Sequence, residues 1–448
     1  MLCQIFSSMY LYLNFDFKVL NRRKCRIMKI LQPFKSLNEP LFAKLYIAQS
    51  ISLLGDAFTW IGVALLAFEF GGNQSAKILA TALTLRVTAF IIFGSYAGVL
   101  ADRFNRKKIM IITNLMRMVI VFSLAFIGNV WQMYIMIFLL NVFNAFFTPA
   151  YKACIPQLIS KKEYYGDAIS LSNATWQLLG VIGPGLAGGL AVVWGSRQIF
   201  LFDAGSFIIS SVLVLSIPIS HLKKEINKTQ SSFVRIWNDI IKGTKLLFHN
   251  QPIRFSLFIE LTAAIAGAQI LVNTVGYIKG NLLMTDKEYG LLMTVFGIGA
   301  TIAAFTANNL DRSKNKTKML IIGALILATA VSLANFASFH SLIFLWIIAG
   351  LGMSFTEIPA QIIIAENIEL EQQGKVYGSH FAWLHLWWAI GYPIAGITGT
   401  YFVNHQFMIG GVLAMVLLIV ICLNRVCKKT PISFPMKNRD RLLRSSEK

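Results

Sequence analysis

Twelve long apolar segments account for most of the chain and constrain its fold more than any other feature. A helix that crosses the hydrocarbon core of a bilayer needs about 20 apolar residues. Soluble domains carry charge on about a quarter of their residues, whereas 14% of this chain is charged and its mean hydropathy is +0.63. We therefore expect an all-α membrane protein with twelve transmembrane helices, at about 42–70, 77–101, 108–128, 130–155, 166–193, 198–219, 253–278, 287–308, 318–338, 340–366, 374–402 and 407–427.

The predicted spans fall into two sets of six. A charged loop recurs at the same place in each set, at 98–108 and again at 310–318, so that Asp102 and Asp311 are 209 residues apart. Such a degenerate repeat predicts two pseudo-symmetric six-helix halves, the plan of a secondary transporter. The expected domains are a basic N-terminal tail at 1–40, a bundle at 41–219, a central loop at 220–252, a second bundle at 253–427 and a basic tail at 428–448.

Lysine and arginine are distributed unevenly over the loops. If the N-terminus lies inside the cell, only four of them fall in outside loops: Lys77, Arg197, Lys279 and Lys287. Because basic residues concentrate in cytoplasmic loops, we expect a multi-pass protein of the inner (plasma) membrane with both termini cytoplasmic. Met28 is an alternative start, so residues 1–27 are either a basic tail or absent from the mature protein.

Several kinds of chemistry have no counterpart in the sequence. The net charge of +21 is spread between apolar segments rather than over one soluble face, which argues against nucleic acid as a partner. The five cysteines have neither metal-site nor disulfide-framework spacing. We find no nucleotide-binding motif and no catalytic motif of a hydrolase or metalloprotease. We therefore expect no enzyme activity, no metal and no cofactor, with a proton gradient as the driving force.

The first two spans each carry one charge at a similar depth. Asp56 lies about 18 Å above Lys44, and Arg86 about 22 Å above Ala101, at 1.5 Å per helical residue. Because an unpaired charge in hydrocarbon is costly, both side chains are expected to face the interior and to pair directly or through water. Two interpretations stay open: a fixed ion pair between the helices, or a carboxylate whose protonation changes during transport.

The second half contains two intramembrane acids of its own. Glu260 lies seven residues after the start of its span and Glu357 nine residues before the end of its span, so both are roughly 10 to 14 Å from the cytoplasmic face. They are expected to share a cavity that Gln269, Asn273 and Gln361 line. Burial favours the neutral form of a carboxyl group. Each acid therefore either pairs with a polar neighbour or binds a proton or a cationic substrate.

Glycine and proline interrupt the fifth span, where Gly183, Pro184 and Gly188 lie on a small-residue face. Small residues let helices approach closely, and proline frees a backbone carbonyl. The segment is either a close-packing face or a bend that moves during gating. The eleventh span combines histidines and tryptophans that form either a lipid-interface belt or a stacking face for substrate: His380, Trp383, His385, Trp387 and Trp388.

The loop GVLADRFNRKK resembles the motif G-x-L-A-D-R-x-G-R-[RK]-[RK] between helices 2 and 3 of the major facilitator superfamily. Asn105 replaces the usual glycine. The resemblance implies the major facilitator fold and a gating motif made of Gly98, Leu100, Asp102, Arg103, Arg106 and Lys107. It also implies that Asp102 caps the start of the eleventh span near 374–378 and that Asp311 and Arg312 form a second-half gating loop.

Further matches resemble one branch of the superfamily, the permeases similar to enterobactin exporters and macrolide efflux proteins. They are SLLGD in the first span, Arg86 in the second, Arg117 in the third, FFTPAYKACIPQL in the fourth and the GP…GG run in the fifth. This resemblance implies proton-driven export of a siderophore, a macrolide or another amphipathic compound.

The sequence thus predicts a secondary transporter, a proton-coupled antiporter that exports a small amphipathic molecule by alternating access. Asp56, Arg86, Glu260 and Glu357 are its candidate coupling or cavity residues. An uptake symporter or a lysophospholipid flippase on the same fold is the alternative, and a membrane receptor or scaffold that transports nothing is a third. The expected partners are a small-molecule substrate and the lipid bilayer, and we expect the protein to function as a monomer.

Overall fold

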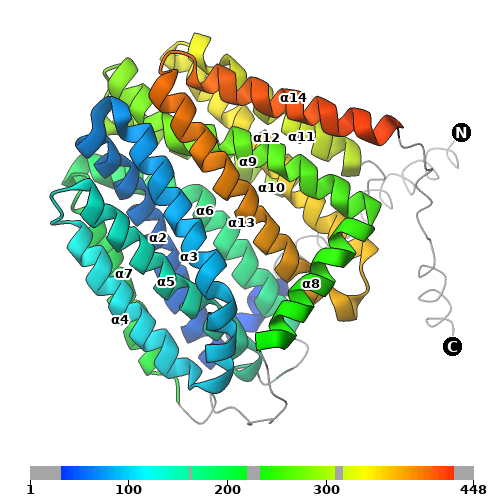
Figure 1. Ribbon diagram of the computed structural model, residues 1–448. Coiled ribbons are helices and arrows are strands. Elements are labelled where there is room, and N and C mark those ends of the chain that lie inside the picture. Colours follow the sequence, from blue (N-terminus) through cyan, green and yellow to red (C-terminus); the bar gives the residue numbers. More distant parts are fainter. Residues whose placement is uncertain (1–31, 160, 162–163, 219–232, 308–315, 428–448) are drawn as a thin grey trace, which may run out of the picture.

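The structure is a computed structural model that describes residues 32–159, 161, 164–218, 233–307 and 316–427. These residues form helices joined by short turns, and no strand occurs among them. Figure 1 shows two helical bundles that follow one another along the chain. The predicted all-α fold with two six-helix halves is confirmed.

Six helices build the first half, and their ends follow local capping chemistry. Pro40 opens the first helix, and Asn105 and Asn129 accept hydrogen bonds from the backbone N–H groups of Lys108 at 3.3 Å and Gln132 at 3.0 Å. After a short helix at Gln32–Asn38 come α2 (Pro40–Gly71), α3 (Ser75–Arg103), α4 (Arg106–Leu124), α5 (Val130–Cys154), α6 (Tyr164–Trp194) and α7 (Ile199–Leu215).

The second half repeats this plan after one additional helix. Asn250 and Ser338 cap two of its helices through the N–H groups of Ile253 and Ser341, both at 3.3 Å. The additional helix is α8 (Phe233–His249), and the six that follow are α9 (Gln251–Gly276), α10 (Asp286–Ala307), α11 (Lys316–Leu333), α12 (Phe339–Asn367), α13 (Leu370–Tyr401) and α14 (Gln406–Cys427).

Each of the twelve predicted spans coincides with a helix over most of its described residues, and the outer surface of the bundles is apolar. Large hydrophobic side chains are exposed there, among them Phe126, Trp131 and Phe344, which suits contact with lipid rather than water. Within the described residues, six segments are long and apolar enough to cross a membrane by length and composition alone: Pro40–Gly94, Val130–Gln157, Gln251–Asn281, Lys316–Phe336, Phe339–Asn367 and Gln406–Asn424.

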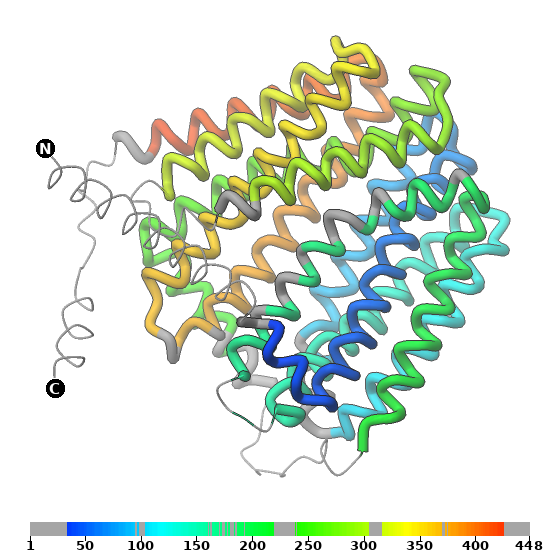
Figure 2. Tube along the Cα trace, turned by 180° about the vertical axis from the view of Figure 1, so that it is seen from behind, coloured from blue at the N-terminus to red at the C-terminus, as the bar shows by residue number. Residues whose placement is uncertain are grey.

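The two halves meet along two seams that small residues line. One seam joins α3 to α13, where a Cβ built on Gly396 would lie 2.6 Å from the Cβ of Ala80. The other joins α6 to α10, where a Cβ built on Gly290 would lie 2.6 Å from the Cα of Gly188. Both close approaches lie at the end of the bundles opposite to the loop at 98–108. Figures 1 and 2 show the bundles diverging from this end toward the end that carries α8.

The central segment contains α8, which corrects the prediction of a loop throughout 220–252. Apolar residues recur at helical spacing along this segment, so the sequence itself contained the signal for a helix. The helix packs against α13, where the hydroxyl of Ser379 donates to the carbonyl of Ile240 at 3.1 Å. A Cβ on Gly243 would lie 2.5 Å from the carbonyl oxygen of Lys375. Glycine is therefore required for this contact.

The seam between α6 and α10 yields a direct test of this arrangement. Gly188→Ala adds a methyl group against the backbone of Gly290, whereas the adjacent Gly189→Ala enters open space. We expect Gly188→Ala to separate the halves at this end, and Gly189→Ala to leave them in place. Spin labels at the exposed residues Asn73 and His405 would report the distance. Unchanged distances in Gly188→Ala would contradict the packing.

Candidate functional site: two buried charge networks

Arg117 on α4 is the centre of a charge network inside the first half. Its side chain is 2% exposed, and its guanidinium lies between the rings of Phe147 and Phe207, at 4.2 and 4.4 Å from their centroids. It donates hydrogen bonds to the amide oxygens of Asn144, at 2.7 Å, and Asn114. Aromatic faces and amide oxygens thus stabilise a cation that hydrocarbon alone would exclude.

Asp203 on α7 is the fully buried acid of the same network. Its carboxylate accepts hydrogen bonds from the hydroxyl groups of Thr59, at 2.5 Å, and Ser206, at 3.0 Å, and it interacts electrostatically with Arg117. A Cβ on Gly55 would collide with this carboxylate, so glycine lets α2 approach α7 here. Asp203 was not among the residues predicted from sequence, although an acid in an apolar span is the same signal that identified Asp56.

Asp56 on α2 lies at the edge of this network and is partly exposed. It interacts electrostatically with Arg117 and, more weakly, with Arg86. The expected proximity of Asp56 and Arg86 is present, but within the described part of the chain no direct ion pair joins them. Arg86 instead lies over the ring of Trp60, 4.2 Å from its centroid. It also interacts electrostatically with His385 and Tyr392 of the second half.

The second half has a smaller network of the same kind. Glu260 on α9 and His380 on α13 are buried, and the carboxylate Oε2 and the ring Nε2 are 2.7 Å apart. Glu357 on α12 is partly exposed and interacts electrostatically with both. The structure therefore brings together the two acids that were expected to share a cavity, and His380 joins them.

Two sets of residues lie elsewhere than the sequence suggested. Gln269 and Asn273 are buried between α9 and α13, where the hydroxyl of Thr398 donates to Gln269 at 2.9 Å, so they stabilise the bundle rather than line a cavity. Among the tryptophans of α13, Trp387 does not face lipid, because it is 6% exposed and its indole N–H donates to the carbonyl of Leu257 at 3.0 Å, whereas Trp383 and Trp388 are partly exposed.

Two residues of the gating motif tie the first-half helices together. Arg106 donates to the carbonyl of Ala153 at the end of α5, at 2.8 Å. The buried ammonium of Lys107 donates to the carbonyls of Leu215 and Ile217 at the end of α7, at 2.7 and 2.6 Å. These bonds satisfy carbonyl groups that a helix end leaves free.

The remaining motif residues have no described contacts. The side chains of Leu100, Asp102 and Arg103 lie outside the described part of the structure, and so do Asp311 and Arg312; Gly98 lies in the helical backbone of α3. The latch between Asp102 and the eleventh span therefore stays a prediction.

Two glycines of α6, Gly183 and Gly188, lie where other helices cross it. A Cβ on Gly183 would collide with the Cβ of Ala57 on α2, and Gly188 meets Gly290 of the second half. The helix is continuous from Tyr164 to Trp194. Close packing is thus one role of these glycines, while the side chain of Pro184 lies outside the description and a bend during gating stays a prediction.

The family assignment follows from comparison with known proteins. The family model of the Major Facilitator Superfamily matches residues 45–277 and 257–443. The chain belongs to the major facilitator superfamily. It is a multi-pass membrane protein of a transporter family, as the loop at 98–108 had indicated.

Relatives and solved structures agree with this assignment. The chain is 26% identical to the uncharacterized MFS-type transporter YfiS of Bacillus subtilis over 77% of this chain and 84% of that protein. It is 24% identical to macrolide efflux protein A of Streptococcus pyogenes over 86% and 95%. The structure of the nucleoside transporter NupG matches 86% of this chain and 98% of its own with a TM-score of 0.66 at 16% identity, which shows a shared fold.

Removing the cation at the centre of the first-half network tests how much Arg117 contributes to the stability of the protein. Arg117→Met would leave Asp203 buried without its cation, and breaking a buried charge pair in this way typically costs about 3–5 kcal/mol. Arg197→Met is the control, because Arg197 and its partner Glu69 are both about a third or more exposed and such pairs contribute about 1 kcal/mol or less. Thermal unfolding in detergent should show a much larger loss for Arg117→Met. Equal losses would contradict the network.

Proposed function

We propose that the protein is a proton-coupled antiporter that exports a small amphipathic compound by alternating access. One observation carries the proposal: each network buries one acid, Asp203 or Glu260, and leaves a second carboxylate, Asp56 or Glu357, partly exposed at its edge. A proton carrier must be reachable from the aqueous side and must have a neighbour that responds to its charge. Asp56 and Glu357 are both partly exposed, and each has charged neighbours that interact with it electrostatically.

The neighbours define how each carboxylate would work. When Asp56 releases its proton, Arg117 and Arg86 stabilise the anion that forms. When Glu357 releases its proton, the electrostatic surroundings of the His380 imidazole change, because His380 contacts Glu260 and interacts electrostatically with both acids. The fully buried Asp203 and Glu260 hold these neighbours in position and do not themselves exchange protons with the cavity.

Cargo and direction are proposed from the relatives and the sequence. Macrolide efflux protein A is similar over nearly its whole length, which supports export and an amphipathic substrate. The proton gradient supplies the driving force without a bound cofactor, and the protein works as a monomer with the bilayer and its small-molecule substrate as partners. The uneven distribution of lysine and arginine supports placing both termini in the cytoplasm.

Transport into inverted membrane vesicles tests the proposal. With an acidic lumen, the wild-type protein is expected to accumulate a labelled macrolide, and collapse of the pH gradient should abolish accumulation. Asp56→Asn and Glu357→Gln should each reduce pH-driven accumulation by at least about tenfold, which corresponds to about 1.4 kcal/mol. Export of other classes would be screened with labelled siderophores and lysolipids in the same vesicles.

The control variant is Glu366→Gln, which changes an exposed acid that pairs with Lys316 at the end of α12. It should retain accumulation. Folding of each variant would be checked by monodispersity in detergent. The coupling role would be wrong if both Asp56→Asn and Glu357→Gln, folded and present at wild-type levels, accumulated cargo as the wild type does.

A further inference from the structure

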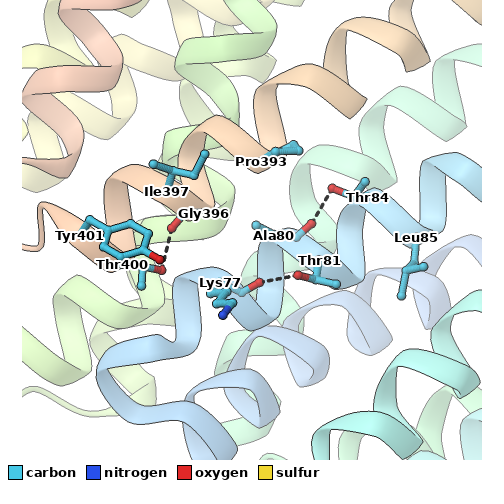
Figure 3. Close-up of a pocket in the computed structure, with 10 residues that line it drawn as sticks. All are labelled: Lys77, Ala80, Thr81, Thr84, Leu85, Pro393, Gly396, Ile397, Thr400 and Tyr401. Atoms are coloured by element: carbon cyan, nitrogen blue, oxygen red, sulfur yellow. Dashed lines mark hydrogen bonds between the residues drawn. The ribbon is translucent and has the colours of Figure 1, made fainter.

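A groove runs along the outside of the seam between α3 and α13. Its volume is about 350 Å³. Two of its lining side chains, Ile397 and Tyr401, are 54% and 73% exposed. Figure 3 shows the lining residues, which are Lys77, Ala80, Thr81, Thr84, Leu85, Pro393, Gly396, Ile397, Thr400 and Tyr401.

The length of the groove along its two helices is close to the thickness of the hydrocarbon region of one bilayer leaflet. Lys77 and Tyr401 mark one end of it, and Leu85 and Pro393 mark the other, eight residues along each helix. Eight helical residues span about 12 Å, and half of the hydrocarbon core is about 15 Å. Lysine and tyrosine are residues that anchor helices at the membrane interface. The groove thus extends from headgroup level toward the middle of the membrane.

The walls of the groove suit a hydrocarbon chain. The hydroxyl groups of Thr81, Thr84 and Thr400 donate to carbonyls of their own helices at 2.8, 2.8 and 2.7 Å (Figure 3). Their protons are therefore engaged, and they present methyl groups and satisfied oxygens to a ligand. The small residues Ala80 and Gly396 form the base of the groove, where the two helices are in contact. Between its two ends, the groove therefore offers a largely apolar wall.

Lys77 supplies the only charged side chain of the lining, and it is exposed at the mouth. A cation at headgroup depth above an apolar groove complements a lipid with an anionic headgroup. We propose that the groove binds one acyl chain of an anionic phospholipid, whose headgroup meets Lys77, in the leaflet away from the loop at 98–108. The surrounding bilayer supplies this occupant directly.

Such a lipid would also act on the arrangement of the halves. The groove is formed jointly by α3 of the first half and α13 of the second, so it exists only while they touch at this end. A ligand that binds one arrangement and not the other shifts the equilibrium toward the arrangement it binds. A bound anionic lipid therefore favours closure here, whatever the coupling ion of the transporter.

Native mass spectrometry of the purified protein tests the site with phosphatidylglycerol and phosphatidylcholine of identical acyl chains. We expect the wild type to retain phosphatidylglycerol preferentially. Lys77→Gln should weaken phosphatidylglycerol retention roughly fivefold, the effect of one interfacial lysine. Lys287→Gln, which removes an exposed lysine at the start of α10, should not change it.

A second variant tests the groove itself. Thr84→Trp fills it and should reduce retention of phosphatidylglycerol, whereas Ile92→Trp, at an exposed position of α3 outside the lining, should not. The proposal would be overturned by equal retention of both lipids by the wild type, by equal losses in Lys77→Gln and Lys287→Gln, or by full retention in monodisperse Thr84→Trp. Displacement of the lipid by a transported macrolide would instead make the groove a path for cargo, and would also overturn it.

Discussion

The high cost of an ionised group in hydrocarbon is the constraint on which this structure depends. Unpaired charges inside a membrane are expensive, yet the spans of this protein contain several acids and arginines. The first half resolves this with Arg117, which two aromatic rings and two amide oxygens surround while two carboxylates lie nearby. The second half resolves it with the contact between Glu260 and His380. Each network also leaves one acid at its edge, and this incomplete burial is the basis on which we propose that Asp56 and Glu357 are the coupling groups.

Close helix packing holds these networks together and also sets where the halves touch. Gly55 lets α2 approach Asp203, while Gly188 and Gly396 let the two halves meet at one end. Arg86 connects the two halves. It stacks on Trp60 within its own half and interacts electrostatically with His385 on α13 of the second half. A relative movement of the halves therefore changes the surroundings of Arg86 directly, and those of Asp56 through it. Packing and electrostatics are coupled at the same seam.

Much of the fold could be predicted from sequence because apolar segments of bilayer length and a repeated charged loop are one-dimensional signals. The positions of Asp56, Glu260 and Glu357 also followed from depth along each span. Partners could not be predicted in this way, because depth does not give rotation about the helix axis. Asp203 was therefore missed, His380 was assigned to a lipid-interface belt or a stacking face rather than to Glu260, and the burial of Trp387 was not predicted. The helix α8 was missed because its short amphipathic pattern lies in a polar segment.

We propose that Asp56 and Glu357 exchange protons with water while Asp203 and Glu260 serve as fixed parts of the two networks. Infrared difference spectroscopy of the reconstituted protein, titrated across the physiological pH range, measures protonated carboxyl groups directly and needs no cargo. The account predicts two titrating carboxyl bands, one lost in Asp56→Asn and the other in Glu357→Gln. Titrating bands that persist unchanged in both variants would contradict it.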